Sequence, residues 1–247
     1  MLQPKLILNY YFSGTGNTKA MAEHFSRQLE ALGYESLLKR MDRDPFEKPD
    51  REFILGLMFP VAIQSTYPNV WDFVEKLPPG EGRQVFMFDT MEAYSGGVVG
   101  PMKKLLSSKG YRCIGAREFK MSSSMNTKAD KVEGGKAKNR AALKRVEQYA
   151  RDLVNGKTRW GRIPLFSDGM RSISRPPKIW ASFSEKLSVT DDCINCLICE
   201  KNCPVSAISH DERKVSLDHG RCICCMRCAA NCPKGAILFS GKKLQLS

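Results

Sequence analysis

The residues of this 247-residue chain best suited to chemistry are its cysteines, most of which belong to a repeated motif. The motif C-x2-C-x2-C-x3-C-P begins at Cys193 and is repeated, complete, from Cys222. Thiolates at this spacing are typical ligands of iron–sulfur clusters. Structural zinc is usually held by C-x2-C pairs separated by a longer loop, and a cysteine cluster of this kind favours metal over disulfides. The repeat therefore predicts iron–sulfur chemistry, with zinc as the less favoured alternative.

The cysteines and histidines outside this motif are not expected to bind metal. Cys224 lies between two ligand positions and is expected to point away from a cluster, with a part in cluster loss or oxidation sensing as the alternative. Cys113 lies in an apolar run and is interpreted as a core residue. The histidines have no partner pattern and are interpreted as surface or packing residues: His24, His210 and His219.

A glycine-rich loop near the start of the chain is the second chemical signal. It consists of Ser13, Gly14, Thr15, Gly16, Asn17 and Thr18. Glycines let backbone N–H groups converge, and hydroxyls add donors at the start of a helix, a combination that binds phosphate. The loop lacks the Walker spacing, and Lys19 stands where a dinucleotide G-x-G-x-x-G motif needs its last glycine. We predict a phosphate site, with a plain glycine turn as the alternative.

The elements that must position these motifs alternate between apolar runs and amphipathic segments up to about residue 160. This alternation predicts an α/β fold, a doubly wound five-stranded parallel sheet. The expected strands are 6–10, 34–39, 53–59, 84–88 and 112–119. The expected helices are 18–32, 70–77, 98–109 and 136–154.

The periodicity fades between residues 156 and 188, where prolines and serines indicate a linker. Its apolar residues predict that it packs as a strap against one or both domains: Trp160, Phe166, Ile179, Trp180 and Phe183. The predicted organisation is an α/β domain (1–160), a linker or strap (161–185) and a small α+β domain (186–247).

The small domain resembles the two-cluster bacterial-type ferredoxins over residues 186–240, with no insertion in either motif. The resemblance implies two [4Fe-4S] clusters with crossed ligands. One cluster would be bound by Cys193, Cys196, Cys199 and Cys232. The other would be bound by Cys222, Cys225, Cys228 and Cys203.

The glycine loop, with the alternation of elements over residues 1–160, resembles the flavodoxins, which bind FMN. The resemblance implies that the loop holds the FMN phosphate and that the loops after the third and fourth strands hold the flavin ring. Those two loops supply Phe59, Pro60, Val61, Thr90, Tyr94, Ser95, Gly96 and Gly97. Phe59 and Tyr94 are candidates to stack on the ring, with core packing as the alternative. Asp89 and Glu92 are expected either to disfavour an anionic reduced flavin or to be ordinary solvated carboxylates.

The complete architecture resembles the flavodoxin–ferredoxin fusion proteins found mainly in anaerobes. It implies an electron carrier that relays electrons between FMN, two clusters and an external redox partner. The alternative is an FMN-dependent reductase of an organic substrate, which would need a proton donor above the flavin. Tyr67, Tyr94 and Glu92 are the available donors. A redox sensor that signals through a change of shape is a third, less favoured function.

Charge and hydropathy bear on the partner and the location. The formal net charge of +13 would fall to about +7 with two clusters and FMN bound. Residues 128–178 carry 14 Lys and Arg against 5 Asp and Glu. We expect an acidic protein (a ferredoxin, flavodoxin or reductase) to dock there, with a solvated face, nucleic acid or an anionic membrane as alternatives.

No apolar run approaches the roughly 18 residues of a membrane helix. The first residues also lack the features of a secretion signal. We therefore expect no membrane span and a cytoplasmic location.

Overall fold

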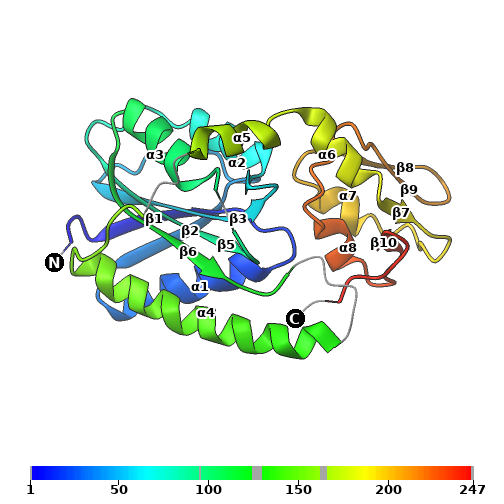
Figure 1. Ribbon diagram of the computed structural model, residues 1–247, viewed down its shortest axis with the longest axis horizontal. Helices are drawn as coiled ribbons and strands as arrows, with labels where there is room; N and C mark the ends of the chain where they lie inside the picture. Colours follow the sequence, from blue (N-terminus) through cyan, green and yellow to red (C-terminus); the bar gives the residue numbers. More distant parts are fainter. Residues whose placement is uncertain (1, 95, 124–129, 162–165, 246–247) are drawn as a thin grey trace.

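The computed structural model describes residues 2–94, 96–123, 130–161 and 166–245. Its α/β part (residues 2–160) is centred on a mainly parallel sheet (Figure 1). The spatial order β2-β1-β3-β5-β6 is that of the flavodoxin-like doubly wound fold, as predicted. The parallel strands are β1 (Leu6–Tyr11), β2 (Glu35–Arg40), β3 (Phe53–Ala62), β5 (Gln84–Met91) and β6 (Arg112–Lys120). A two-residue strand, β4 (Ser65–Thr66), which the sequence did not indicate, pairs antiparallel with the end of β3.

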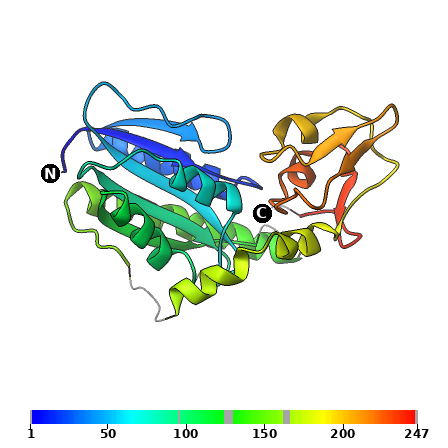
Figure 2. The same cartoon turned by 90° about the horizontal axis from the view of Figure 1, so that it is seen from above.

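Helices cover both faces of this sheet (Figures 1 and 2). One apolar cluster joins the sheet to α1 (Asn17–Ala31) and α4 (Asp130–Val154). The other joins it to α2 (Pro68–Glu75) and α3 (Val99–Ser108). Because the central strands are covered on both sides, they are continuous apolar runs without alternation. Helix α4 begins six residues before the predicted start, beyond two glycines that lower helix propensity.

The strap (residues 161–185) contains two helices where the sequence indicated a linker, α5 (Ser167–Ser174) and α6 (Pro177–Ser184). The predicted packing of the strap is confirmed at Trp180, which is buried and lies against the Tyr67 ring, with centroids 5.3 Å apart. Phe183 packs against the apolar cluster of the cysteine-rich part. The prediction is wrong for Phe166, whose exposure is 73%.

The cysteine-rich part (residues 186–245) is a small α+β unit, as predicted. Two antiparallel pairs form it, β7 (Leu187–Val189) with β10 (Ile237–Phe239) and β8 (Ile208–His210) with β9 (Val215–Leu217). Two short helices, α7 (Ile198–Asn202) and α8 (Arg227–Asn231), contact each other. Across the described ranges of the chain, no helix combines the length and apolar character needed to cross a membrane.

Candidate functional site

The cysteines of the repeat line two small cavities in the cysteine-rich part. One is lined by Cys193, Cys196, Cys199 and Cys232. The other is lined by Cys203, Cys222, Cys225 and Cys228. Each cavity therefore collects three cysteines of one motif and the fourth of the other, which is the crossed arrangement that the resemblance implied. Four thiols in an apolar setting fit a [4Fe-4S] cluster.

The same cysteines are not arranged for zinc. Among the described residues, no group of three or more Cys, His, Asp or Glu could hold a single metal ion. A zinc ion needs all four sulfurs within about 2.3 Å of one point, whereas a cube of irons and sulfides holds its thiolates farther apart. This geometry favours a cluster over zinc.

The two cysteine loops share one backbone conformation. Left-handed residues occur at Asn195 and Leu197 in the first loop and at the matching Cys224 and Met226 in the second. Such conformations cost energy in residues other than glycine and cluster at ligand sites. Burial raises the pKa of Cys225 to about 12, so this thiol stays protonated until a bound metal lowers its pKa.

A larger cavity, of about 430 Å³, lies between the α/β part and the cysteine-rich part. Its size is within the range of cofactor pockets. Its polar lining comes from the glycine loop, the end of β5 and the loop after β6: Ser13, Thr15, Asn17, Thr18, Thr90, Ser122 and Ser123. Its apolar lining comes from the β3–β4 hairpin, the strap and the second cysteine loop: Pro60, Val61, Ala62, Ile63, Trp180, Phe183 and Met226. A ligand with a polar end and a flat apolar end would match this lining.

The glycine loop leads into the N-terminus of helix α1 and lines this cavity. Gly16 has φ 107°, which glycine adopts without strain, and its N–H donates to Ser13 Oγ at 3.2 Å. Thr18 Oγ1 is hydrogen-bonded to Thr90 Oγ1 at 2.7 Å, and Asn17 Nδ2 donates to the Ser122 carbonyl at 3.1 Å. No side chain of the described residues caps α1, so its first amides are free to bind an anion.

The residues implied in ring binding divide into two groups. Pro60, Val61 and Thr90 line the large cavity. Phe59 does not line it, because its side chain is fully buried in the core beneath the sheet. Tyr94 is 52% exposed and is also absent from the lining. Neither of the two aromatic residues therefore lines this cavity.

The glycines after β5 also lie elsewhere, because their backbone packs against the strap and the β3–β4 turn. The Gly96 carbonyl accepts a hydrogen bond from Ser167 Oγ at 2.6 Å, and the Gly97 N–H donates to the Gln64 carbonyl at 2.7 Å. Neither lines the cavity. Ser95 lies outside the described residues.

Asp89 and Glu92, the two carboxylates near the end of β5, have different surroundings. Asp89 is fully buried, and neither carboxyl oxygen has a hydrogen-bond partner within the described chain. Asp89 is therefore not a solvated carboxylate, and burial, with repulsion from Glu118, raises its pKa well above the usual value. Glu92 is exposed and lines the cavity.

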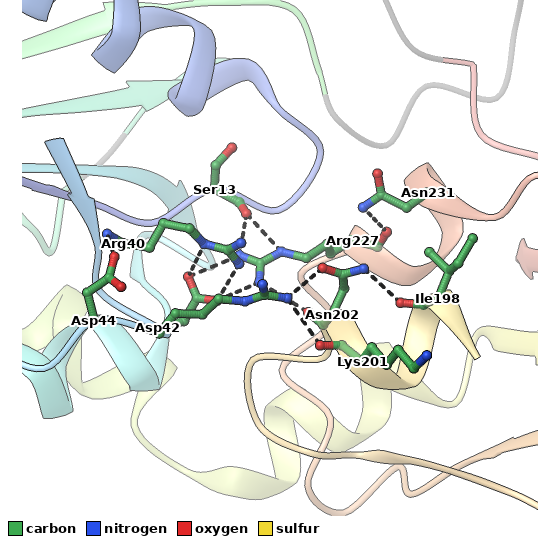
Figure 3. A network of polar contacts seen from close by, with 10 residues as sticks. Ser13, Arg40, Asp42, Asp44, Ile198, Lys201, Asn202, Arg227 and Asn231 are labelled. Carbon is green, nitrogen blue, oxygen red and sulfur yellow. Dashed lines mark hydrogen bonds and ion pairs between the residues drawn. The ribbon is translucent and has the colours of Figure 1, made fainter. Parts of the chain in front are cut away.

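A buried ion pair joins the two parts beside this cavity (Figure 3). Arg227, between Cys225 and Cys228, donates to Asp42 Oδ2 at 2.6 Å and to the Ser13 carbonyl at 2.6 Å. Burial opposes ionisation of Asp42, yet the hydrogen bonds from Arg227 and Arg40 hold the pKa of this carboxyl below its usual value. No sequence motif identified this pair. A cation between two cysteine ligands was the one available sign.

Comparisons with known proteins found similarities for both parts of the chain. Residues 192–236 match the family model of the 4Fe-4S dicluster domain. No curated protein matches the chain. The α/β part is similar to the two-electron reduced flavodoxin of Megasphaera elsdenii (24% identity, TM-score 0.43), covering 56% of this chain and 98% of that one. It is also similar to rubredoxin oxygen:oxidoreductase of the anaerobe Desulfovibrio gigas (12%, TM-score 0.40), covering 59% of this chain and 37% of the oxidoreductase.

The chain therefore combines a flavodoxin-like fold, defined by its strand order, with a 4Fe-4S domain, defined by its cysteines and the family match. The predicted combination is confirmed. A redox role follows from it.

Proposed function

We propose that this protein carries electrons between FMN, two [4Fe-4S] clusters and an external redox partner. One observation supports this most strongly: the same cavity is lined by the glycine loop and by Cys224, Cys225 and Met226 of the second cysteine loop. When bound, FMN exchanges one or two electrons, and each cluster exchanges one at a time. A flavin in this cavity would lie directly beside a cluster.

The chain's own residues would hold FMN by its two ends. The first amides of α1 and the loop hydroxyls would bind the phosphate, since they combine donors with the positive end of the helix dipole. Pro60, Val61 and Ile63 of the β3–β4 hairpin, with Trp180 of the strap, would exclude water from the ring.

The position of this cavity suggests which of the two proposed clusters would lie nearer to FMN. The cluster on Cys203, Cys222, Cys225 and Cys228 is proposed as proximal to FMN, because Cys225 lines both its own cavity and the larger one. The other cluster is proposed as distal. Its ligand Cys196 is exposed, and its neighbour Ile194 is 56% exposed, so electrons could pass there to a partner.

The basic face of α4 is proposed as the docking surface for an acidic redox partner at the FMN end. Lys138 and Arg140 are exposed on either side of Asn139, whose Oδ1 accepts a hydrogen bond from the cavity residue Ser122. In Figure 1 this N-terminal end of α4 is the end nearest the cysteine-rich part. Opposite charge would speed the encounter.

The test begins with an anaerobic preparation in which iron, sulfide and acid-extracted flavin are quantified. One centre is then rapidly reduced, and the transfer of electrons to the other centres is followed. About eight irons and one FMN per chain, with electrons passing between flavin and clusters, are expected. Eight irons with no flavin after incubation with FMN would refute the relay. Flavin reoxidation that depends on an organic substrate would support a reductase instead.

The phosphate site is tested by a matched pair at Thr15, which lines the cavity. Thr15→Asp adds a negative charge facing the phosphate and should weaken FMN binding about a hundredfold or more. Thr15→Asn has nearly the same shape without the charge and should bind FMN much more tightly. Both should keep their iron. Equal FMN affinity in the two variants would place the phosphate elsewhere.

A further inference from the structure

The second cysteine loop is in close contact with the glycine loop of the α/β part. We propose that Arg227 and Asp42 form an interdomain clamp that fixes the proximal cluster against the FMN cavity and thereby sets the rate of electron transfer between them. This inference rests on the proposed function. Arg227 is a positioning residue in it, since it acts through the loop that it holds.

The hydrogen bonds of Arg227 fix the position of its guanidinium group between the two parts. Besides Asp42 and the Ser13 carbonyl, its guanidinium donates to the Asn202 carbonyl at 3.1 Å and lies 5.2 Å from the centre of the Phe12 ring. Side-chain exposures are 7% for Arg227 and 2% for Asp42, so water does not compete for these bonds. A guanidinium group that donates to acceptors on three segments of the chain is held more rigidly than one in a single surface ion pair.

Beside the clamp, the backbone of the glycine loop lies close to the backbone of the second cysteine loop. A Cβ atom on Gly14 would lie 1.9 Å from the carbonyl oxygen of Cys225, so only glycine allows this approach. The backbone of Gly14 is not left-handed, and alanine could adopt it. The requirement for glycine therefore comes from the opposing loop. Ile223, in the same cysteine loop, belongs to the apolar core cluster of the α/β part.

These contacts concern the transfer step because Arg227 lies between two ligand positions. Any shift of its backbone moves Cys225 and Cys228 with it, and the rate of electron tunnelling falls steeply with distance. The step moves one electron between FMN and the proximal cluster, one centre being oxidised and the other reduced, with no bond formed between the two parts.

The clamp is tested in the loaded, full-length protein with Arg227→Gln and Asp42→Asn. Internal electron transfer, followed by flash reduction of the flavin, should slow about tenfold to a hundredfold in both. Arg43→Gln is the matched control, since Arg43 also donates across the interface, to Asn202 Oδ1 at 2.7 Å, but is exposed. The control should stay within about twofold of the parent rate.

Two further measurements separate positioning from loss of fold. Rates are compared per molecule that carries both cofactors, and flavin fluorescence lifetime, which a nearby cluster shortens, should lengthen in the clamp variants. Gly14→Ala, which keeps both residues of the ion pair, should also slow the transfer, because its Cβ pushes the two loops apart. If the parent protein transfers electrons internally and all three variants match its rate, the clamp is refuted and the relay stands. If the parent itself shows no internal transfer, the relay is refuted.

Discussion

The buried carboxyl of Asp89 gives the sharpest test of the energetics of this fold. Its pKa is raised by burial, and then by Glu118, from an ordinary value of 3.8. The folded state therefore holds a proton that the unfolded state releases above pH 3.8, so stability falls as pH rises from there until the folded pKa is reached. Each pH unit within that window costs about 1.4 kcal/mol. Asp89→Asn removes this dependence.

The measurement is the apparent melting temperature of the FMN-loaded protein and of Asp89→Asn at pH 5.5, 6.5 and 7.5. From pH 5.5 up to the folded pKa, the advantage of the variant should grow by about 3–5 °C per pH unit, because 1 kcal/mol shifts the melting temperature of a chain of this size by about 2–4 °C. Asp50→Asn, at an exposed carboxylate, should show no such trend. A pH-independent difference, or destabilisation by Asp89→Asn throughout, would mean that the carboxyl is ionised or stabilised by a contact.

Three other changes test the site and its surroundings. Cys203→Ser should lose the cluster of the second motif while Cys224→Ser keeps the full iron content, and equal iron in the two would contradict the crossed ligands. Ile223→Ala should destabilise the protein by about 2–4 kcal/mol, whereas Ile194→Ala, at the same position of the first loop, should be nearly neutral; similar melting temperatures would contradict the burial of Ile223. Reversing the exposed charges of α4 to Glu should slow reduction by an acidic ferredoxin, most strongly at low salt, and unchanged rates at low salt would reject this docking surface. The residues reversed are Lys136, Lys138, Lys144 and Arg145.

The sequence predicted the central strands well because they are covered on both faces and form long apolar runs. It indicated the 4Fe-4S domain because the spacing within each cysteine motif is local along the chain. The packing of the strap against the loop after β5 could not be predicted. Helices α5 and α6 are only eight residues each, too short to show a clear periodicity, so the strap was interpreted as a linker. Yet α5 packs onto Gly96 and Gly97, and neither glycine lines the cavity.

The duplicated cysteine motif shows why the interface itself could not be predicted. Both loops have the same spacing and the same left-handed positions, so every local rule applies equally to each. Ile194 and Ile223 are even the same residue at the same position, but the first is 56% exposed and the second 6%. Among the described residues, Ile223 packs into the apolar cluster of the α/β part, whereas Ile194 does not belong to that cluster. Where the second loop meets the α/β part, Arg227 stands at the position of Ile198, so the difference between the two cysteine loops includes one cation and the distant Asp42 that accepts its hydrogen bonds.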